Sequence, residues 1–374
     1  FLSLLLLVLL TSCSDTPVTQ DSLEKSPIQV SSNQEETLTE NVIEEIIGEE
    51  IELEDTPEVN LEEREWQEEA QQIIQEDTYS DLSLPALTSE EITWSDLVLE
   101  QVLSSTANYT RYRISYKNGD LSLSGIMNIP NGDWPYPLLI LNHGYIDTRY
   151  YTNGRWLKRE QDYFANNGFA VLHPDYRNHA FSDKVSETPY DFRLGYTTDV
   201  IASVLAVQKS ELPELSFIDS TRVWMLGHSM GGWVTQNVSV SYPDLIDTVV
   251  LYGPVSNQEY LNFEQFQLSN AERSTRVTQV IEDHQTPSEN PVFWDGVSSR
   301  TFINNISAPY KIFTGTADDS TPTEWAQNIA SDLEAAGKQV EKVSYPGEGH
   351  EFGPQFSDFM QQSWEFFREG LAEK

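Results

Sequence analysis

Unbroken apolar runs alternate with helical patterns over most of the chain. The runs Pro137 to Asn142 and Phe169 to His173 lack polar alternation, which is typical of parallel strands buried on both faces of a sheet. Further apolar runs of this kind are Val223 to Leu226 and Thr248 to Tyr252, and Tyr310 to Gly315 and Gln339 to Tyr345 are expected to be the last two strands. Helical patterns occupy Arg155 to Asn167, Thr197 to Lys209, Thr323 to Ala336 and Phe356 to Leu371. This alternation predicts an α/β fold with a mostly parallel sheet flanked by helices.

Two segments depart from this rhythm. Arg111 to Tyr116 and Leu121 to Ile129 alternate apolar and polar residues around Lys117-Asn118-Gly119-Asp120, which predicts a β-hairpin. Residues 253–306 show helical stretches and no clear strand, and we expect them to form a cap or a wall of the substrate pocket. Their aromatic residues either line that pocket or form a small core of their own, and the sequence favours neither: Tyr260, Phe263, Phe266, Phe293 and Trp294.

The N-terminal part has a different composition. Residues 14–88 are rich in Ser, Thr, Gln, Glu and Pro, and between Asp15 and Asp77 there are 21 acidic residues against two basic ones. Such a segment cannot build a core of its own, so the sequence predicts an acidic, mostly disordered tether; a partner-binding segment is the alternative. The folded domain is then expected to span residues 89–374.

The first residues resemble an export signal. Phe1 to Leu10 is a short apolar run, too short to span a bilayer, and Leu10-Thr11-Ser12-Cys13 resembles a bacterial lipobox whose cysteine is acylated. Residues 1–13 are therefore expected to be a truncated lipoprotein signal that anchors the protein to a bacterial membrane outside the cytoplasm. An ordinary cleaved signal peptide and the remnant of a longer membrane helix are the alternatives.

Composition sets further limits. The 374 residues carry a formal charge of -38, which repels phosphate backbones and argues against a nucleic-acid partner. Cys13 is the only cysteine, so the fold cannot contain an intramolecular disulfide. We expect neither a cofactor nor a metal, because His, Cys and Glu do not recur at the spacing of metal ligands.

A candidate nucleophile follows the apolar run Val223 to Leu226. Gly227-His228-Ser229-Met230-Gly231 fits the G-x-S-x-G elbow, and a helix-compatible segment comes next. In this elbow the serine occupies a strained turn, and side chains two residues before and after it would collide. Ser229 is therefore the predicted nucleophile.

A serine nucleophile needs a base, and the base needs an acid. Only His284 and His350 follow Ser229 in the chain; His284 lies in a polar stretch and is expected at the surface, whereas His350 lies in the loop after the last strand. We predict His350 as the base. The loop after Tyr310 to Gly315 offers two adjacent acids, of which Asp318 is preferred and Asp319 is the alternative.

The oxyanion hole requires two N–H donors. Met230 follows the nucleophile and Tyr145 follows an early strand, so their backbone N–H groups are the predicted donors. His143 is expected to be a structural histidine hydrogen-bonded within its loop, and His228 to serve in packing or in lining the pocket.

Five motifs together resemble the α/β-hydrolase domain of the prolyl oligopeptidase family and the related dienelactone hydrolases. They are Asn142 to Tyr145, Asp175-Tyr176-Arg177, Gly227 to Gly232, Gly315 to Pro322 and Gly347 to Phe352. The resemblance covers about Tyr109 to Phe367 and implies Ser229, Asp318 and His350 as the triad. Two departures are visible: the acidic tether stands where these peptidases carry a β-propeller, and the usual D-Y-R-G-x-G continues here as Asn178-His179-Ala180, which makes a bulkier loop.

The resemblance implies a serine hydrolase that cleaves short peptides or small esters through an acyl-enzyme. A serine peptidase of the prolyl oligopeptidase type is the first expectation, and a carboxylesterase of the dienelactone hydrolase type is the second. A binding protein that retains the fold without catalysis is the third.

Overall fold

The computed structural model describes residues 79–89, 92–132, 134–185, 193–268 and 274–372. All of them belong to one unit, Glu65–Lys374. The predicted lipobox with Cys13 and the tether up to residue 78 lie outside the described residues. Within the described part, no helix is long and apolar enough to span a bilayer.

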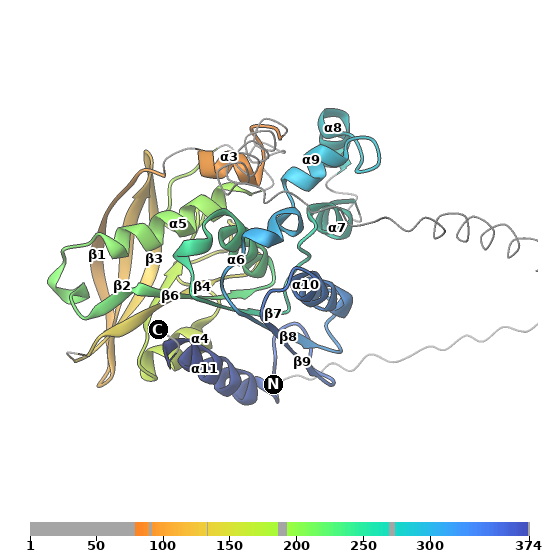
Figure 1. The fold of residues 1–374 in the computed structure, drawn as a ribbon. Helices are drawn as coiled ribbons and strands as arrows, with labels where there is room; N and C mark the ends of the chain where they lie inside the picture. Colours follow the sequence, from red (N-terminus) through yellow and green to blue (C-terminus); the bar gives the residue numbers. More distant parts are fainter. Residues whose placement is uncertain (1–78, 90–91, 133, 186–192, 269–273, 373–374) are drawn as a thin grey trace, which may run out of the picture. The chain divides into compact units, whose positions relative to one another are not determined.

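The predicted apolar runs are strands of a single sheet. The strands are β1 (Trp94–Ser105), β2 (Tyr109–Asn118), β3 (Leu121–Pro130), β4 (Tyr136–Asn142), β5 (Ala170–Pro174), β6 (Ile218–His228), β7 (Thr248–Tyr252), β8 (Tyr310–Gly315) and β9 (Val340–Tyr345). Among the described residues the strand order is β1-β2-β3-β5-β4-β6-β7-β8-β9 (Figure 1). The predicted hairpin is confirmed, because β2 and β3 pair antiparallel. Every neighbouring pair from β5 to β9 is parallel, so the predicted fold class is correct.

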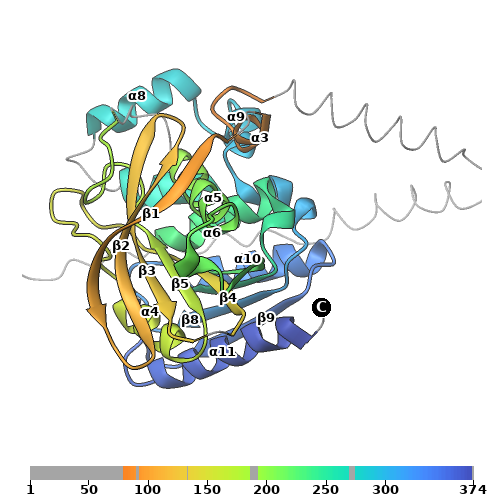
Figure 2. The same cartoon turned by 90° about the vertical axis from the view of Figure 1, so that its left-hand side faces the viewer.

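Helices cover both faces of this sheet (Figures 1 and 2). One face carries α4 (Lys158–Asn166) and α11 (Phe356–Ala372), and the other carries α5 (Gly195–Gln208), α6 (Met230–Ser241) and α10 (Thr323–Ala335). Successive residues of a strand therefore enter different cores. In β6, Val223 and Met225 pack on the α5 and α6 side, whereas Trp224 and Leu226 pack on the α11 side. This is why the run Val223 to Leu226 within β6 is apolar at every position.

Strand β1 was not predicted from the sequence. Val98 and Val102 remain 48% and 54% exposed, and three register shifts interrupt the pairing of β1 with β2. The strand therefore shows neither an unbroken apolar run nor a regular alternation, which are the two patterns that identify a strand.

The packed part also begins earlier than the predicted boundary at residue 89. Helix α3 (Leu84–Ser89) places Leu84 in the core, and Leu82 and Leu87 pack against that core. Residues 79–88 are therefore folded and do not belong to a disordered tether. The sequence placed the boundary too late because three leucines change the average composition of a long polar segment very little.

The loop after β5 has a backbone suited to glycine at two positions that lack it. Asn178 has φ 70° and Ala180 has φ 43°, both in the left-handed region. Asn tolerates this region, and the Asn178 side chain also accepts a hydrogen bond from the Val185 N–H at 2.8 Å. The departure from D-Y-R-G-x-G thus changes the residue types while both positions remain left-handed.

Candidate active site

Ser229 lies at the turn between β6 and α6. Its φ of 56° and ψ of -122° are strained for a residue with a side chain. A Cβ added to Gly227 would lie 2.5 Å from the Gly231 oxygen, and one added to Gly231 would lie 1.9 Å from the Asn142 oxygen. Both positions therefore require glycine, as the G-x-S-x-G pattern predicts.

Asp318 and His350 meet across neighbouring loops. Asp318 follows β8 and His350 follows β9, and these parallel strands are adjacent in the sheet. The His350 Nδ1 atom lies 2.8 Å from Oδ2 of Asp318, whose side chain is fully buried. Asp319 is exposed, and its carboxylate accepts a hydrogen bond from the Ser320 hydroxyl. Of the two adjacent acids, Asp318 is thus the one in contact with His350.

The Asp318 carboxylate is also held by its own loop. It accepts hydrogen bonds from the backbone N–H groups of Ser320 and Thr321, both at 2.9 Å, and from the Thr321 hydroxyl at 2.8 Å. Burial by itself raises the pKa of Asp318, but the hydrogen bonds from His350, Thr321 and Ser320 together bring this pKa below its ordinary value. Asp318 is therefore ionised at neutral pH and favours a proton on Nδ1 of His350.

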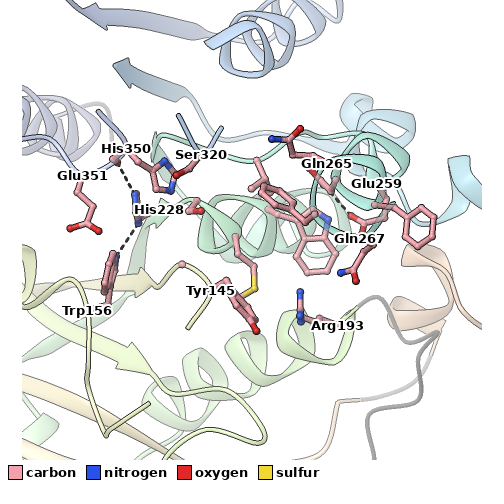
Figure 3. A pocket seen from close by; sticks show the side chains of 18 of the residues that line it. Tyr145, Trp156, Arg193, His228, Glu259, Gln265, Gln267, Ser320, His350 and Glu351 are labelled. Carbon is pink, nitrogen blue, oxygen red and sulfur yellow. Dashed lines mark hydrogen bonds between the residues drawn. The ribbon is translucent and has the colours of Figure 1, made fainter. Parts of the chain in front are cut away.

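Ser229 and His350 line the same cavity, whose volume is about 520 Å³ (Figure 3). Within the described part of the chain, the ring of His350 contacts Asp318 and Thr321, and no hydrogen bond joins it to the Ser229 hydroxyl. Rotation about the Cα–Cβ bond gives this hydroxyl three staggered positions. In free enzymes such a bond often forms only when substrate binds.

The two predicted oxyanion donors also border this cavity, together with Ser229. The Met230 N–H belongs to the first residue of α6 and has no acceptor within the helix. Gly144 lets the β4 loop approach the nucleophile, because a Cβ there would lie 3.1 Å from Cβ of Ser229. Among the described residues, neither the Tyr145 N–H nor the Met230 N–H donates to a backbone acceptor.

His228 both packs and lines the cavity, as the sequence suggested. Its Nδ1 lies 3.1 Å from the indole nitrogen of Trp156, and its Nε2 lies 3.0 Å from the backbone oxygen of His350. Because an indole N–H can only donate, Nδ1 is the acceptor and Nε2 carries the hydrogen. Burial, followed by the proximity of His350, lowers the pKa of His228 to about 3. His228 therefore stays neutral and attaches the His350 loop to the nucleophile turn.

His143 and His284, which the sequence analysis also considered, have structural roles. His143 is buried, with Nδ1 2.8 Å from the Gly144 oxygen and Nε2 3.4 Å from the Asp175 oxygen, so its predicted structural role is confirmed. His284 is only partly exposed and stacks on Phe293 at 3.9 Å between ring centroids. The expectation that His284 is a surface residue is therefore wrong, because the insertion has an aromatic cluster against which it packs.

Gly253 is a site residue that the sequence reasoning missed. It has φ 49°, and a Cβ added to it would lie 3.1 Å from His350 Nδ1 and 3.2 Å from Asp318 Oδ2. It directly follows β7, and glycine after a buried strand was the available signal. Thr321 was missed as well, because hydroxyls near an acid are common in loops.

The insertion of residues 253–306 is helical, as predicted, and its aromatic residues serve both expected purposes. Its helices are α7 (Glu259–Phe263), a π-helical turn at Glu264–Leu268, α8 (Ser274–His284) and α9 (Pro291–Gly296). Phe263 and Phe266 line the cavity, whereas Tyr260 and Phe293 pack against Trp294. The segment is therefore a wall of the cavity with a small core of its own.

Glu259 contributes a carboxyl group to this wall. Burial raises its pKa to about 7, although the Asn262 amide, Arg193 and Trp233 act in the opposite direction. The Asn262 amide donates to this carboxyl at 3.1 Å.

No group of three or more potential metal ligands occurs within the described ranges.

A family model described as the prolyl oligopeptidase family matches residues 155–374, which is more than half of the chain. Among curated proteins, uncharacterised proteins of Mycobacterium tuberculosis and Mycobacterium bovis are 32% identical over 115 residues. That match covers 31% of this chain and 28% of each relative, so the chain spans less than a third of their length.

Solved structures agree in fold. The acetyl xylan esterase 1 from Thermoanaerobacterium is 18% identical with a TM-score of 0.56, and the match covers 75% of this chain and 89% of the esterase. The acylaminoacyl peptidase of Pyrococcus horikoshii is 18% identical with a TM-score of 0.55, covering 70% of this chain and 41% of the peptidase. At this level of identity the similarity establishes the α/β-hydrolase fold.

The first prediction concerns Gly253. We expect Gly253→Ala to displace His350 from Asp318 and to abolish the low-field NMR resonance of the His350 Nδ1 proton. Gly337→Ala is the matched control, because Gly337 also has a positive φ of 68° but has nothing within 4 Å of the added Cβ. Both variants should lose roughly 1 kcal/mol of unfolding free energy through backbone strain. Retention of the resonance in Gly253→Ala would show that the glycine is not needed for this contact.

The second prediction concerns pH. In the unfolded chain Glu259 ionises near 4.5, and in the folded chain near 7. Between these pH values the unfolded state loses a proton that the folded state keeps, so the stability that depends on Glu259 falls as pH rises from about 4.5 to 7 and is constant above. Glu259→Gln removes this dependence and should be more stable than wild type above pH 7 by about 1 to 3 kcal/mol.

Urea unfolding at pH 5, 6, 7 and 8 measures this difference. Glu264→Gln is the control, because Glu264 is exposed and the substitution changes only the surface charge. A wild-type and Glu259→Gln difference that is equal at all four pH values would contradict the prediction.

Proposed function

The chain belongs to the prolyl oligopeptidase family and is a serine hydrolase, and from this premise we propose that it cleaves short peptides or small esters through Ser229, His350 and Asp318. The observation that carries the assignment is the 2.8 Å contact between His350 and Asp318 beside the cavity that Ser229 lines. The strained backbone of Ser229 supports the role of nucleophile, because such strain is retained mainly at functional sites.

The proposed reaction has two steps. His350 takes the proton of the Ser229 hydroxyl through Nε2, and the resulting alkoxide attacks the substrate carbonyl carbon. His350 then gives this proton to the leaving nitrogen or oxygen, and the acyl group stays on Ser229 until water releases it by the same route. Asp318 holds the Nδ1 proton and stabilises the imidazolium that forms in each step.

The developing oxyanion is proposed to accept hydrogen bonds from the N–H groups of Tyr145 and Met230. Both residues border the cavity beside Ser229. Loss of one such donor typically costs about 3 to 4 kcal/mol of transition-state stabilisation. The approach of the Gly144 backbone to Ser229 supports this role, since a donor is useful only where the charge develops.

Peptidase activity of the prolyl oligopeptidase type is the first proposal, because the family match covers the whole segment that bears the three residues. Ester cleavage is the second, and the fold match over 89% of an acetyl xylan esterase supports it. Chromogenic peptides linked through proline or alanine, tested beside p-nitrophenyl esters, distinguish the two by the ratio of their kcat/KM values.

The third prediction tests the nucleophile and the base. Ser229→Ala and His350→Gln should each lower kcat by at least about 10⁴-fold, and Ser229→Ala should abolish labelling by a fluorophosphonate probe. His284→Gln is the matched control, because this other histidine packs on Phe293 within the insertion. Labelling that survives in Ser229→Ala would refute the assignment. A wild-type protein that never reacts would instead support a non-catalytic binding function.

The fourth prediction concerns the N-terminus. We propose that Cys13 carries a lipid and anchors the protein outside the cytoplasm, an assignment supported by the Leu10-Thr11-Ser12-Cys13 pattern after an apolar run. Cells that express the full chain should incorporate a palmitate analogue into the protein, and Cys13→Ser should remove the label. Incorporation that persists in Cys13→Ser would contradict lipidation at this residue.

A further inference from the structure

The cavity has two chemically different ends. His350, Trp156 and Glu351 border one end, and Glu259 and Gln267 lie on the other side of the cavity (Figure 3). Apolar side chains also line the cavity: Val255, Phe263, Phe266 and Val280. A substrate that fills the cavity therefore meets apolar walls as well as the polar groups of the Glu259 end.

Two residues that line this cavity each carry a buried polar atom without a hydrogen-bond partner of good geometry within the described residues. These atoms are the indole Nε1 of Trp233, whose residue is 4% exposed, and the amide oxygen Oε1 of Gln267. The first can only donate and the second can only accept. A buried polar atom without a partner costs about 1 to 3 kcal/mol, so such atoms are rarely left unpaired without a functional reason.

Glu259 belongs to the same group. Trp233 lies close enough to the Glu259 carboxyl to lower its pKa, although its N–H makes no hydrogen bond of good geometry within the described part. Burial raises the pKa of Glu259 to about 7, so near neutral pH a large fraction of this carboxyl is uncharged. Arg193, which also lines the cavity, acts on Glu259 with the opposite charge. This end therefore carries no full negative charge, and a substrate group bound there need not be a cation.

The chemistry at Ser229 decides which part of the substrate points there. In the proposed mechanism His350 protonates the leaving group, so the leaving group must lie beside His350. The acyl group lies on the opposite side of the carbonyl carbon from the leaving group and therefore extends away from His350. Figure 3 shows Glu259 across the cavity from His350.

We propose that the Glu259 end of the cavity is a subsite for a hydroxyl group on the acyl part of the substrate. A hydroxyl accepts one hydrogen bond from the Trp233 N–H and donates one to the Gln267 oxygen, which satisfies both unpartnered atoms. The preferred substrates are then esters or amides of hydroxylated acids with an apolar middle. This inference rests on the proposed function.

The fifth prediction uses matched p-nitrophenyl esters of six- and eight-carbon acids that end in a methyl, a methoxy or a hydroxyl group. For at least one of the two chain lengths, the kcat/KM of the wild-type protein should be about tenfold higher for the hydroxyl ester than for the methyl ester. The kcat/KM for the methoxy ester of that length should lie between these two values. Trp233→Phe and Gln267→Leu should each bring this ratio toward one. Glu264→Gln, a change at an exposed neighbour, should keep the wild-type ratio.

A binding measurement separates this inference from the proposed function. In Ser229→Ala protein, the indole N–H resonance of Trp233, assigned by its loss in Trp233→Phe, should move to lower field on titration with ethyl 6-hydroxyhexanoate and not with ethyl hexanoate. This readout needs no turnover. If the hydroxyl ester is neither preferred in hydrolysis nor shifts this resonance, or if the preference survives in both variants, the subsite is refuted. Failure of the proposed function appears separately, as absent turnover and absent probe labelling in the wild type.

Discussion

The close approach of three backbone segments at Ser229 is the constraint on which the rest of the site depends. A Cβ at Gly231 would lie 1.9 Å from the Asn142 oxygen, and a Cβ at Gly232 would lie 2.9 Å from Pro254. The end of β4, the nucleophile turn and the segment after β7 thus pack with no room for side chains. Because the backbones touch, the β4 loop brings Tyr145 to the cavity, and Gly253, which follows β7, lies next to the Asp318–His350 contact. One steric condition therefore fixes the positions of Ser229, of the candidate oxyanion donors and of the space that His350 occupies.

The two neighbouring histidines of the site, His228 and His350, differ in burial and in hydrogen-bond partners, and these differences determine which of them can carry a proton. His228 and His350 lie with ring centroids 4.5 Å apart, and the buried carboxylate of Asp318 contacts the ring of His350. The Trp156 N–H occupies Nδ1 of His228, and burial lowers the pKa of this histidine to about 3. In the proposed mechanism, the proton taken from Ser229 is therefore held by His350 and is not shared with His228. The neutral His228 can donate to the His350 backbone without repelling the imidazolium that catalysis requires.

The sequence predicted the parts of the fold that have strong periodic patterns and the site residues that belong to motifs. The parallel strands were visible because both faces are buried, as alternate residues of β6 illustrate. β1 could not be predicted from the sequence. It is an edge strand with exposed Val98 and Val102 and with register shifts, so its residues show neither an apolar run nor a regular alternation of apolar and polar positions. The choice between Asp318 and Asp319 needed geometry, since adjacent residues in a loop point in different directions. Thr321 and Gly253 were missed for a related reason: their importance lies in contacts across loops that are far apart in the chain.

The sheet positions the candidate catalytic residues, whereas the insertion forms a wall of the cavity. The fold therefore determines the type of reaction more firmly than it determines which substrate is bound. Ser229, Asp318 and His350 lie in loops at the ends of β6, β8 and β9, whose positions are fixed by hydrogen bonds along the whole sheet. Glu259 and Gln267 lie on the insertion, which has its own aromatic cluster around Trp294 and contributes no strand within the described residues. Substitutions on this wall alter the size and polarity of the cavity without disturbing the strand ends. Trp233 connects the two parts, because it lies on the helix that follows the nucleophile and yet borders the cavity with Glu259. The position of its indole N–H is therefore set by α6, which follows β6 in the sheet. The hydrogen-bond acceptor for this N–H comes from the insertion or from the substrate.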